Sequence, residues 1–358
     1  MIRTLRKHWL LGLCLLLLLG CGVCLLALNG VKKALPSQQA ARRWQGENDT
    51  AFAQISCFMP TADGLSMERL YAFRNDMAQK LIGASLDPQK DTGLYTDAWC
   101  SFGKVKVSAG RRSGEVQAVA VGGRFFDFHP LQLLSGNYLS PDDVMDDRVL
   151  LDRETAWLLF GGTELTGMSF SINGTPFVVA GVYERESDRF SKSADDGGMC
   201  IYMSWEGYCR LTETEPGIVC YELVMAEPVK GFVYSAVEEK FPIKTAELVD
   251  NSHRYEADRL LKLLKNRTER SMRKGNVTLP YWENAARASE DSAAQLLAGA
   301  MLLATVPAVL ALYALIRFLV RGKTRMEDEW LPKARDSVEE AVRVRARRRW
   351  EKKHPGMK

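Results

Sequence analysis

The sequence lacks the residue patterns that carry most enzyme chemistry. Its histidines are four and widely separated, without the short spacing of a zinc site: His8, His129, His253 and His354. There is no Gly-x-Ser-x-Gly elbow, and the triplet 322–324 lacks the earlier glycine and the strand of a phosphate-binding loop. We therefore assign no catalytic, cofactor-binding or metal-binding residue, and expect a protein that is not an enzyme. His129, in the aromatic run 125–130, is interpreted as a packed or surface histidine.

A basic stripe on a folded core is also missing, although the net charge of the chain is +4. Residues 1–9 carry three basic and no acidic side chains, and residues 317–358 carry 14 basic and 7 acidic ones. The body, 10–316, is left with 31 basic and 37 acidic side chains. A nucleic-acid-binding domain places its basic surface on the fold itself. We therefore expect no nucleic-acid partner.

Two long uncharged runs are present instead. Residues 9–28 form a run of 20, which as a helix extends about 30 Å, the thickness of the hydrocarbon core of a bilayer. A second run covers 293–316 and continues past Arg317 to residue 320, with Pro307 inside it. No other stretch reaches this length, so we predict two transmembrane helices, at 9–28 and 293–320, with the lipid bilayer as a partner.

The basic flanks predict the orientation. Positive residues precede the first run and follow the second: Arg3, Arg6, Lys7, Arg317, Arg321, Lys323 and Arg325. Both termini, 1–8 and 321–358, are then cytoplasmic, and 29–292 lies outside the cell membrane. Four basic residues just beyond the first run oppose this orientation: Lys32, Lys33, Arg42 and Arg43. Long translocated segments obey the rule less strictly, so the prediction is kept.

The first run is interpreted as an uncleaved anchor. A cleaved signal peptide has a shorter apolar core. The stretch Leu18-Leu19-Gly20-Cys21 resembles a lipoprotein signal, but the residues after Cys21 stay apolar. Lipidation of Cys21 is left open as the alternative.

Five of the eight cysteines lie between the two runs: Cys57, Cys100, Cys200, Cys209 and Cys220. An odd number cannot pair completely within one chain. An oxidising exterior permits Cys57–Cys100 or a pair among the last three, and buried free thiols are an equal alternative.

Short strand and helix patterns alternate between the runs and predict an α+β domain. The expected strands are 51–59, 94–109, 115–122, 148–151, 168–172, 176–182, 200–203 and 218–225. The expected helices are 66–81, 153–160, 205–210, 229–240 and 256–273, with a polar helical stalk at 35–49. Residues 110–114 predict a turn with solvated arginines, and Asn173-Gly174 predicts a tight hairpin.

The stretch from about 119 to 183 resembles the extracytoplasmic core domain of MacB-type ABC transporter permeases. The matching blocks, in order, are VGGRFF (121–126), PLQLLSGNYL (130–139), SPDD (140–143), VLLD (149–152), AWLLFGG (156–162), LTG (165–167) and FSINGTPFVVAGV (170–182). The resemblance implies an outer domain of two subdomains on one N-terminal helix, followed by three C-terminal helices driven by a cytoplasmic ATPase. This sequence has one C-terminal run where the resemblance implies three.

The predicted helix 338–353 in the basic tail has three interpretations. It lies on anionic lipids of the inner leaflet, it docks an ATPase or another permease, or it is a solvated tail that enforces topology. Limited aromatic content, Trp350 alone, argues against RNA binding.

The favoured function is a non-enzymatic, membrane-anchored subunit of a MacB-like ABC system. Its outer domain would serve protein contact or mechanotransmission beside a separate ATPase and a second permease, with an oligomer left open. The alternative is a stand-alone envelope sensor or scaffold that uses the same outer domain without an ATPase.

Overall fold

The computed structural model describes residues 2–47, 50–88, 92–143, 145–195, 197–266, 273–274, 277–325 and 330–353. The chain divides into two compact units. Leu26–Leu297 form the domain, and Met1–Leu25 with Ala298–Lys358 form the other unit. The two are described separately.

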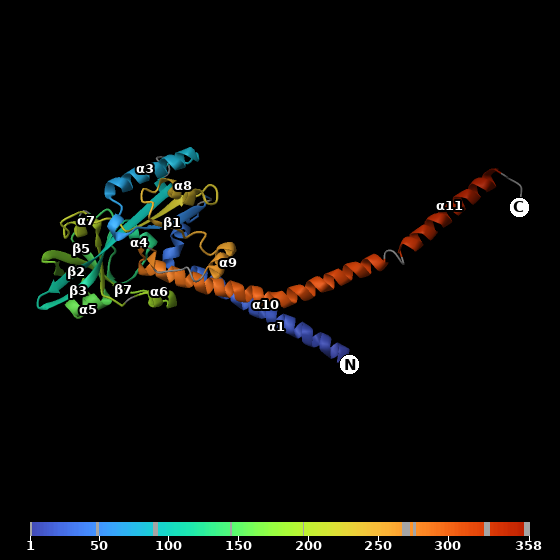
Figure 1. The fold of residues 1–358 in the computed structure, drawn as a ribbon, viewed down its shortest axis with the longest axis horizontal. Helices are drawn as coiled ribbons and strands as arrows, with labels where there is room; N and C mark the ends of the chain where they lie inside the picture. Colours follow the sequence, from blue (N-terminus) through green and yellow to red (C-terminus); the bar gives the residue numbers. More distant parts are fainter. Residues whose placement is uncertain are drawn as a thin grey trace. The chain divides into compact units, whose positions relative to one another are not determined.

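Three long helices make up the second unit, and part of two of them belongs to the domain (Figure 1). They are α1 (Ile2–Lys33), α10 (Tyr281–Arg325) and α11 (Leu331–Lys353). The helical stretches Trp9–Lys33 and Tyr281–Lys323 are long and apolar enough to cross a membrane. The predicted spans 9–28 and 293–320 lie within them, and Pro307 lies inside α10 as expected.

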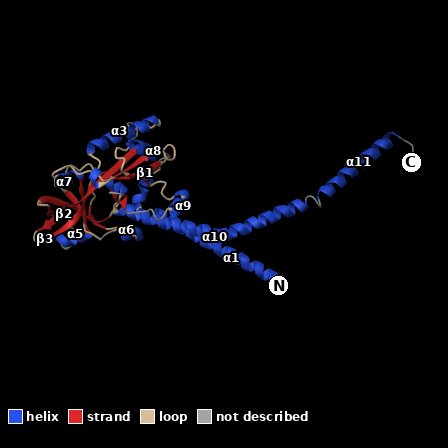
Figure 2. Cartoon of the chain, viewed as in Figure 1, coloured by secondary structure: helices blue, strands red, loops and turns tan. Residues whose placement is uncertain are grey.

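Ten strands of the domain form one sheet, drawn in red in Figure 2. They are β1 (Phe52–Phe58), β2 (Tyr95–Ala109), β3 (Arg112–Gly123), β4 (Gln132–Gly136), β5 (Arg148–Asp152), β6 (Ser169–Ile172), β7 (Thr175–Glu184), β8 (Cys200–Ser204), β9 (Cys220–Ala226) and β10 (Glu247–Asp250). Their order is β10-β1-β9-β2-β3-β8-β5-β7-β4. The pairs β3–β8 and β5–β7 are parallel, and the other pairs in the sheet are antiparallel. A two-stranded ribbon joins β11 (Arg273–Lys274) and β12 (Val277–Thr278).

The sheet closes on itself at one end. Strand β6 pairs both with β7 and with the end of β2, through Val107 and Ser108. The pairings β2-β3-β8-β5-β7-β6-β2 therefore form a closed circuit of six strands. At its other end β2 pairs with β9, which continues to β1 and β10 as an open sheet. The domain thus consists of a small barrel and an open sheet that share β2.

Short helices cover these strands. On the open sheet, α3 (Met67–Gly83) packs beside α8 (Phe232–Lys240), which contacts β1 (Figure 1). Phe73 of α3 meets Tyr221 and Phe241 edge-on, with ring centroids 5.7 and 5.2 Å away. The remaining helices of the domain are α2 (Ala40–Gln45), α4 (Phe125–Phe128), α5 (Arg153–Leu159), α6 (Arg189–Ala194), α7 (Trp205–Cys209) and α9 (Ala257–Lys265), and the short 3-10 turn η1 (Pro36–Gln39) precedes α2.

Local signals in the sequence fix two of these elements. Asn173 and Gly174 have φ values of 51° and 86°, the left-handed conformations of a two-residue hairpin, and they join β6 to β7. Asp152 ends β5, and its carboxylate accepts the backbone N–H of Thr155, which caps α5. Both elements were predicted, and the α+β class is confirmed.

Three predicted elements were wrong in extent. The turn 110–114 is only two residues long, because Ala109 already pairs with Arg112, which places Arg112 in β3. The helix 256–273 ends at Lys265, and Arg273 belongs to β11, while 267–272 lie outside the described residues. The expected stalk 35–49 contains η1 and α2, which packs against β1, and its residues 48 and 49 are outside the described part.

All eight cysteines are free thiols. The pairing Cys57–Cys100 is excluded, because β9 lies between β1 and β2 and places the two strands two spacings apart. Cys100 faces Cys220 on β9 instead. Burial and the nearby Cys100 thiol raise the pKa of Cys220, and burial also raises the pKa of Cys57. Cys209 is half-buried, and burial with Glu215 and Glu206 raises its pKa to about 11.

Alkylation of the native protein tests these environments. Only the thiolate reacts, so we expect the reaction of Cys209 with iodoacetamide to accelerate about tenfold per pH unit between pH 8 and 10. Cys57 and Cys220 should stay unmodified until the chain is denatured. Peptide mass spectrometry gives the three rates, and a plateau of the Cys209 rate near pH 9 would contradict the raised pKa.

Candidate coupling site at the start of the second apolar helix

The first turns of α10 are buried in the domain through small side chains. Ala285 and Ala286 are fully buried and pack with Leu35 and Phe190. Two turns later a second apolar cluster forms around the same helix, from Leu28, Leu260, Ala293 and Ala294. Because alanine lets backbones approach closely, α10 fits tightly between the end of α1, α6 and α9.

The buried side chain of Arg254 fixes the first turns of α10 through ion pairs. Arg254 is 4% exposed, and its Nη2 donates to both carboxylate oxygens of Glu283, each at 2.8 Å. Nη1 donates to Gln38 at 3.0 Å. The Nε atom lies 2.8 Å from Glu290 Oε1, as an ion pair without hydrogen-bond alignment. Arg254 therefore joins η1 to two positions on α10 that lie about two turns apart.

A second arginine completes the network from α10 itself. Arg287 Nε donates to Glu283 at 2.9 Å, and Arg287 Nη2 donates to Glu247 of β10 at 2.6 Å. Two guanidinium groups thus share three carboxylates in a buried setting. Removing one partner of such a network leaves uncompensated charge away from water, which is far more costly than the loss of a surface pair.

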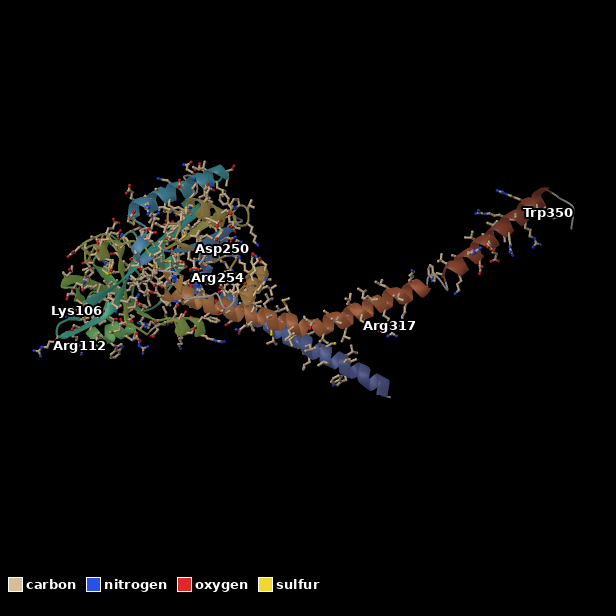
Figure 3. All side chains as sticks on the ribbon, viewed as in Figure 1. Lys106, Arg112, Asp250, Arg254, Arg317 and Trp350 are labelled. Atoms are coloured by element: carbon tan, nitrogen blue, oxygen red, sulfur yellow. The ribbon has the colours of Figure 1, made fainter. Side chains whose placement is uncertain are left out.

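The segment Asp250–Tyr255, called the connecting segment below, links this network to the sheet. Asp250 pairs with Arg259 of α9 at 2.8 Å and with His253 at 3.1 Å. Tyr255 shares a hydrogen bond of 2.5 Å with Ser289 of α10. Figure 3 labels Asp250 and Arg254, which lie at the end of β10 and just after it.

A buried polar chain continues from the connecting segment into the sheet. Asn251 donates to Ser56 of β1 at 2.6 Å, and Ser56 donates to Glu222 of β9 at 2.5 Å. The other oxygen of Glu222 contacts His129, which is 4% exposed and lies 4.6 Å from the Trp282 ring. His129 is therefore packed, one of the two interpretations of the sequence. The chain of contacts runs from strand to strand and ends again at α10.

On α9, Leu260 is buried, Leu263 and Leu264 pack against the same cluster, and Leu261 is exposed. The arginines singled out in the sequence lie elsewhere. Arg111 and Arg112 lie at the exposed end of the β2–β3 hairpin, where Figure 3 labels Arg112. The arginines of the predicted helix 338–353 lie on α11, in the other unit.

Sequence reasoning missed the charged network. Arg254 and Glu283 are 29 residues apart, and no local signal marks either as buried. The spacing of Glu283, Arg287 and Glu290 on one helical face was the available indication.

The comparison with known families decides the class of the domain. Residues 25–239 match the model of the MacB-like periplasmic core domain. The chain belongs to this family. The match begins near the end of α1 and includes the barrel, most of the open sheet and α8, so the resemblance seen over 119–183 is confirmed over a longer stretch.

Solved structures of the same kind are similar to the domain. The periplasmic region of MacB from Actinobacillus actinomycetemcomitans is 17% identical, with a TM-score of 0.40, 64% of this chain covered and 96% of that one. The extracellular domain of the noncanonic ABC-type transporter YknZ from Gram-positive bacteria is 13% identical, with a TM-score of 0.39 and coverages of 55% and 99%. No curated protein matches the chain.

Replacing Arg254 with methionine tests the network. Glu283 and Glu290 then lose a buried partner, and we expect the domain to lose about 3–5 kcal/mol of stability. The melting temperature of the full-length protein in detergent should fall by several degrees.

The matched control is Arg153→Met, which breaks an exposed pair with Glu184. This variant should melt close to the wild type, because exposed ion pairs add little. Equal shifts in the two variants would show that the Arg254 network does not hold the helix start.

Proposed function

We propose that this protein is a non-enzymatic, membrane-anchored subunit of a MacB-like ABC system, in which the outer domain moves with α10 and contacts other proteins. The complex is powered by a separate ATPase. Family membership supports the permease class, and one observation carries the mechanical role. The helix that holds the apolar stretch begins inside the domain, where buried ion pairs fix it to the connecting segment.

Helix α10 connects the apolar stretch to the domain, and this connection supports the mechanical role. Helix α10 has 45 residues, so it is about 67 Å long. It contains a single proline, Pro307, which has no backbone N–H to donate to the preceding turn. A displacement of the apolar part is carried along a helix of this kind to Glu283 and Glu290. From there the connecting segment transmits it to β10 and β1.

We further propose that both termini are cytoplasmic and that the domain lies outside the cell membrane. The positive residues that flank both apolar stretches support this orientation. The basic helix α11 is then placed at the inner leaflet, where it can reach anionic lipids or the ATPase.

A stand-alone sensor or scaffold is the second candidate. It is favoured by the outer surface of α3, which exposes Tyr71 and Ile82 to solvent at 55% and 46%. Such a protein would use the same domain for contact but would have no ATPase partner.

Purification of the tagged full-length chain from its native membrane in mild detergent separates the two. We expect an ABC ATPase or a second permease among the proteins identified by mass spectrometry. In a companion variant, Arg343, Arg345 and Arg347 become glutamine, which should reduce recovery of the ATPase if α11 docks it. The control replaces Glu339 and Glu340 on the same helix with glutamine. Recovery of the chain alone, or with an unrelated envelope protein, would favour the sensor.

Cysteine accessibility tests the orientation. In a background without the native cysteines, a single cysteine at Arg111 should react with a membrane-impermeant maleimide on intact cells. A cysteine at Arg345 should react only after permeabilisation. The reverse pattern would refute the proposed topology.

A further inference from the structure

A cavity of about 440 Å³ lies within the domain beside the coupling site. Strands β2, β3, β7 and β8, helix α6 and residues from the stretch 278–284 all contribute to its lining. The volume falls within the range of small-molecule sites. Neither the polar chain nor the charged network described above occupies this space.

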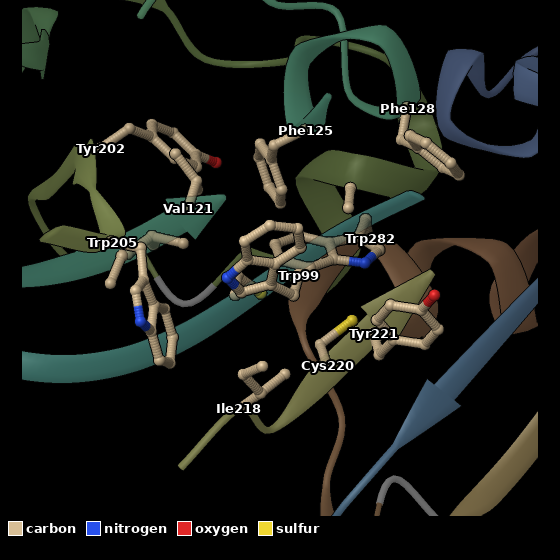
Figure 4. Packing of buried hydrophobic residues seen from close by; sticks show 14 of the residues in the cluster. Trp99, Val121, Phe125, Phe128, Tyr202, Trp205, Ile218, Cys220, Tyr221 and Trp282 are labelled. Carbon is tan, nitrogen blue, oxygen red and sulfur yellow. The ribbon is translucent and has the colours of Figure 1, made fainter. Parts of the chain in front are cut away.

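The walls of the cavity are rich in aromatic rings. Phe102, Tyr183, Tyr202, Tyr281 and Trp282 all line it. The rings of Tyr183 and Tyr202 are 5.3 Å apart, those of Phe102 and Trp282 5.9 Å, and those of Tyr281 and Trp282 5.3 Å. Figure 4 shows Tyr202 and Trp282 within the buried hydrophobic cluster of the domain. Aromatic faces carry partial negative charge and attract cations.

Three charged residues also line the cavity, and they differ in whether an oppositely charged side chain pairs with them. Arg185 is held by Asp152 at 2.7 Å and by Asp195 at 3.0 Å, so its positive charge is compensated. Glu186 accepts a hydrogen bond of 2.8 Å from Ser191 of α6. Among the side chains that the structure describes, which do not include Arg273 and Lys274, no lysine, arginine or histidine forms an ion pair with Glu186. The nearby imidazole of His129 is already engaged by Glu222.

The surroundings of the Glu186 carboxylate disfavour its ionised form. Glu186 is half-buried, and desolvation raises the pKa of its carboxyl group, against opposing contributions from the Ser191 hydrogen bond and from His129. Burial and the proximity of Glu186 likewise raise the pKa of Tyr281, so this phenol stays neutral. Two wall residues add polar atoms without a hydrogen-bond partner in the described chain, Trp282 Nε1 and Asn284 Oδ1.

We propose that this cavity binds an organic cation with an apolar body, with Glu186 as its counter-ion and the aromatic rings as its walls. A cation satisfies both features at once, because it neutralises the carboxylate and is attracted by the ring faces. An anion would meet an arginine that is already paired. A neutral ligand would leave the carboxylate desolvated and uncompensated. The indole N–H of Trp282 can bond an acceptor atom of the ligand.

Calorimetry with the full-length protein in dodecyl maltoside, a detergent without charge, tests the proposal. Benzyltrimethylammonium is the probe, and benzyl alcohol and benzoate are its neutral and anionic counterparts. We expect the cation to bind at least about tenfold more tightly than either counterpart. Because this comparison uses the unmodified protein, it does not depend on the folding of any variant.

Substitution then assigns the binding to Glu186. Glu186→Gln removes the charge and keeps the shape, and it should weaken the cation at least about tenfold. Glu164→Gln, at an exposed acid that does not line the cavity, makes the same charge change and should leave the affinity unchanged. Melting curves without probe verify that both variants are folded.

Three results would overturn the proposal. They are the absence of cation binding at millimolar concentration, tighter binding of benzoate or benzyl alcohol, and an unchanged cation affinity in Glu186→Gln. None of them bears on whether an ATPase co-purifies with the chain, so the proposal and the function above fail independently.

Discussion

Strand β2 is the element on which the rest of the domain depends, because it belongs to the barrel and to the open sheet at once. Its first residues pair with β9, and its last residues pair with β3 and β6. A strand with 15 residues is long enough to serve both. Since backbone hydrogen bonds join the two parts through one continuous strand, they cannot rotate independently about a linker. A displacement of one part relative to the other must therefore bend or twist β2.

The charged network explains how a helix can be attached to such a body with a fixed register. Alanine contacts on α10 are small and similar from turn to turn, so packing alone would tolerate a slide of the helix. Arg254 contacts Glu283 and Glu290, which are seven residues apart and lie on one face. A slide by one turn would separate these charges in a buried setting, at a cost that apolar packing does not offset. The network therefore fixes the register of α10 on the domain.

Elements controlled by residues close together in the chain could be predicted from the sequence, and contacts between residues far apart in the chain could not. Asp152 and Asn173-Gly174 act on neighbours within three residues, and the elements they control were predicted. Strands β4 and β10 were missed. They have only five and four residues, and their pairing with β7 and β1 joins residues far apart in the chain. Arg254 and Glu186 were missed for a different reason. A charged residue is normally exposed, and only the fold brings the partner of Arg254 from 29 residues away. Likewise, only the fold places Glu186 where no described basic side chain forms an ion pair with it.

The cavity and the coupling site share one short stretch of chain. Tyr281 and Trp282 are the first two residues of α10 and line the cavity, and the next residue, Glu283, is the bidentate partner of Arg254. A ligand held by these rings restrains the helix start that the ion pairs orient. If the helix start takes two positions during a transport cycle, a ligand that prefers one of them shifts the balance toward it. By linkage, the state of α10 then alters the affinity of the cavity by the same factor. In that case, a change in the occupancy of the cavity changes the position of α10, and a change in the position of α10 changes the occupancy of the cavity.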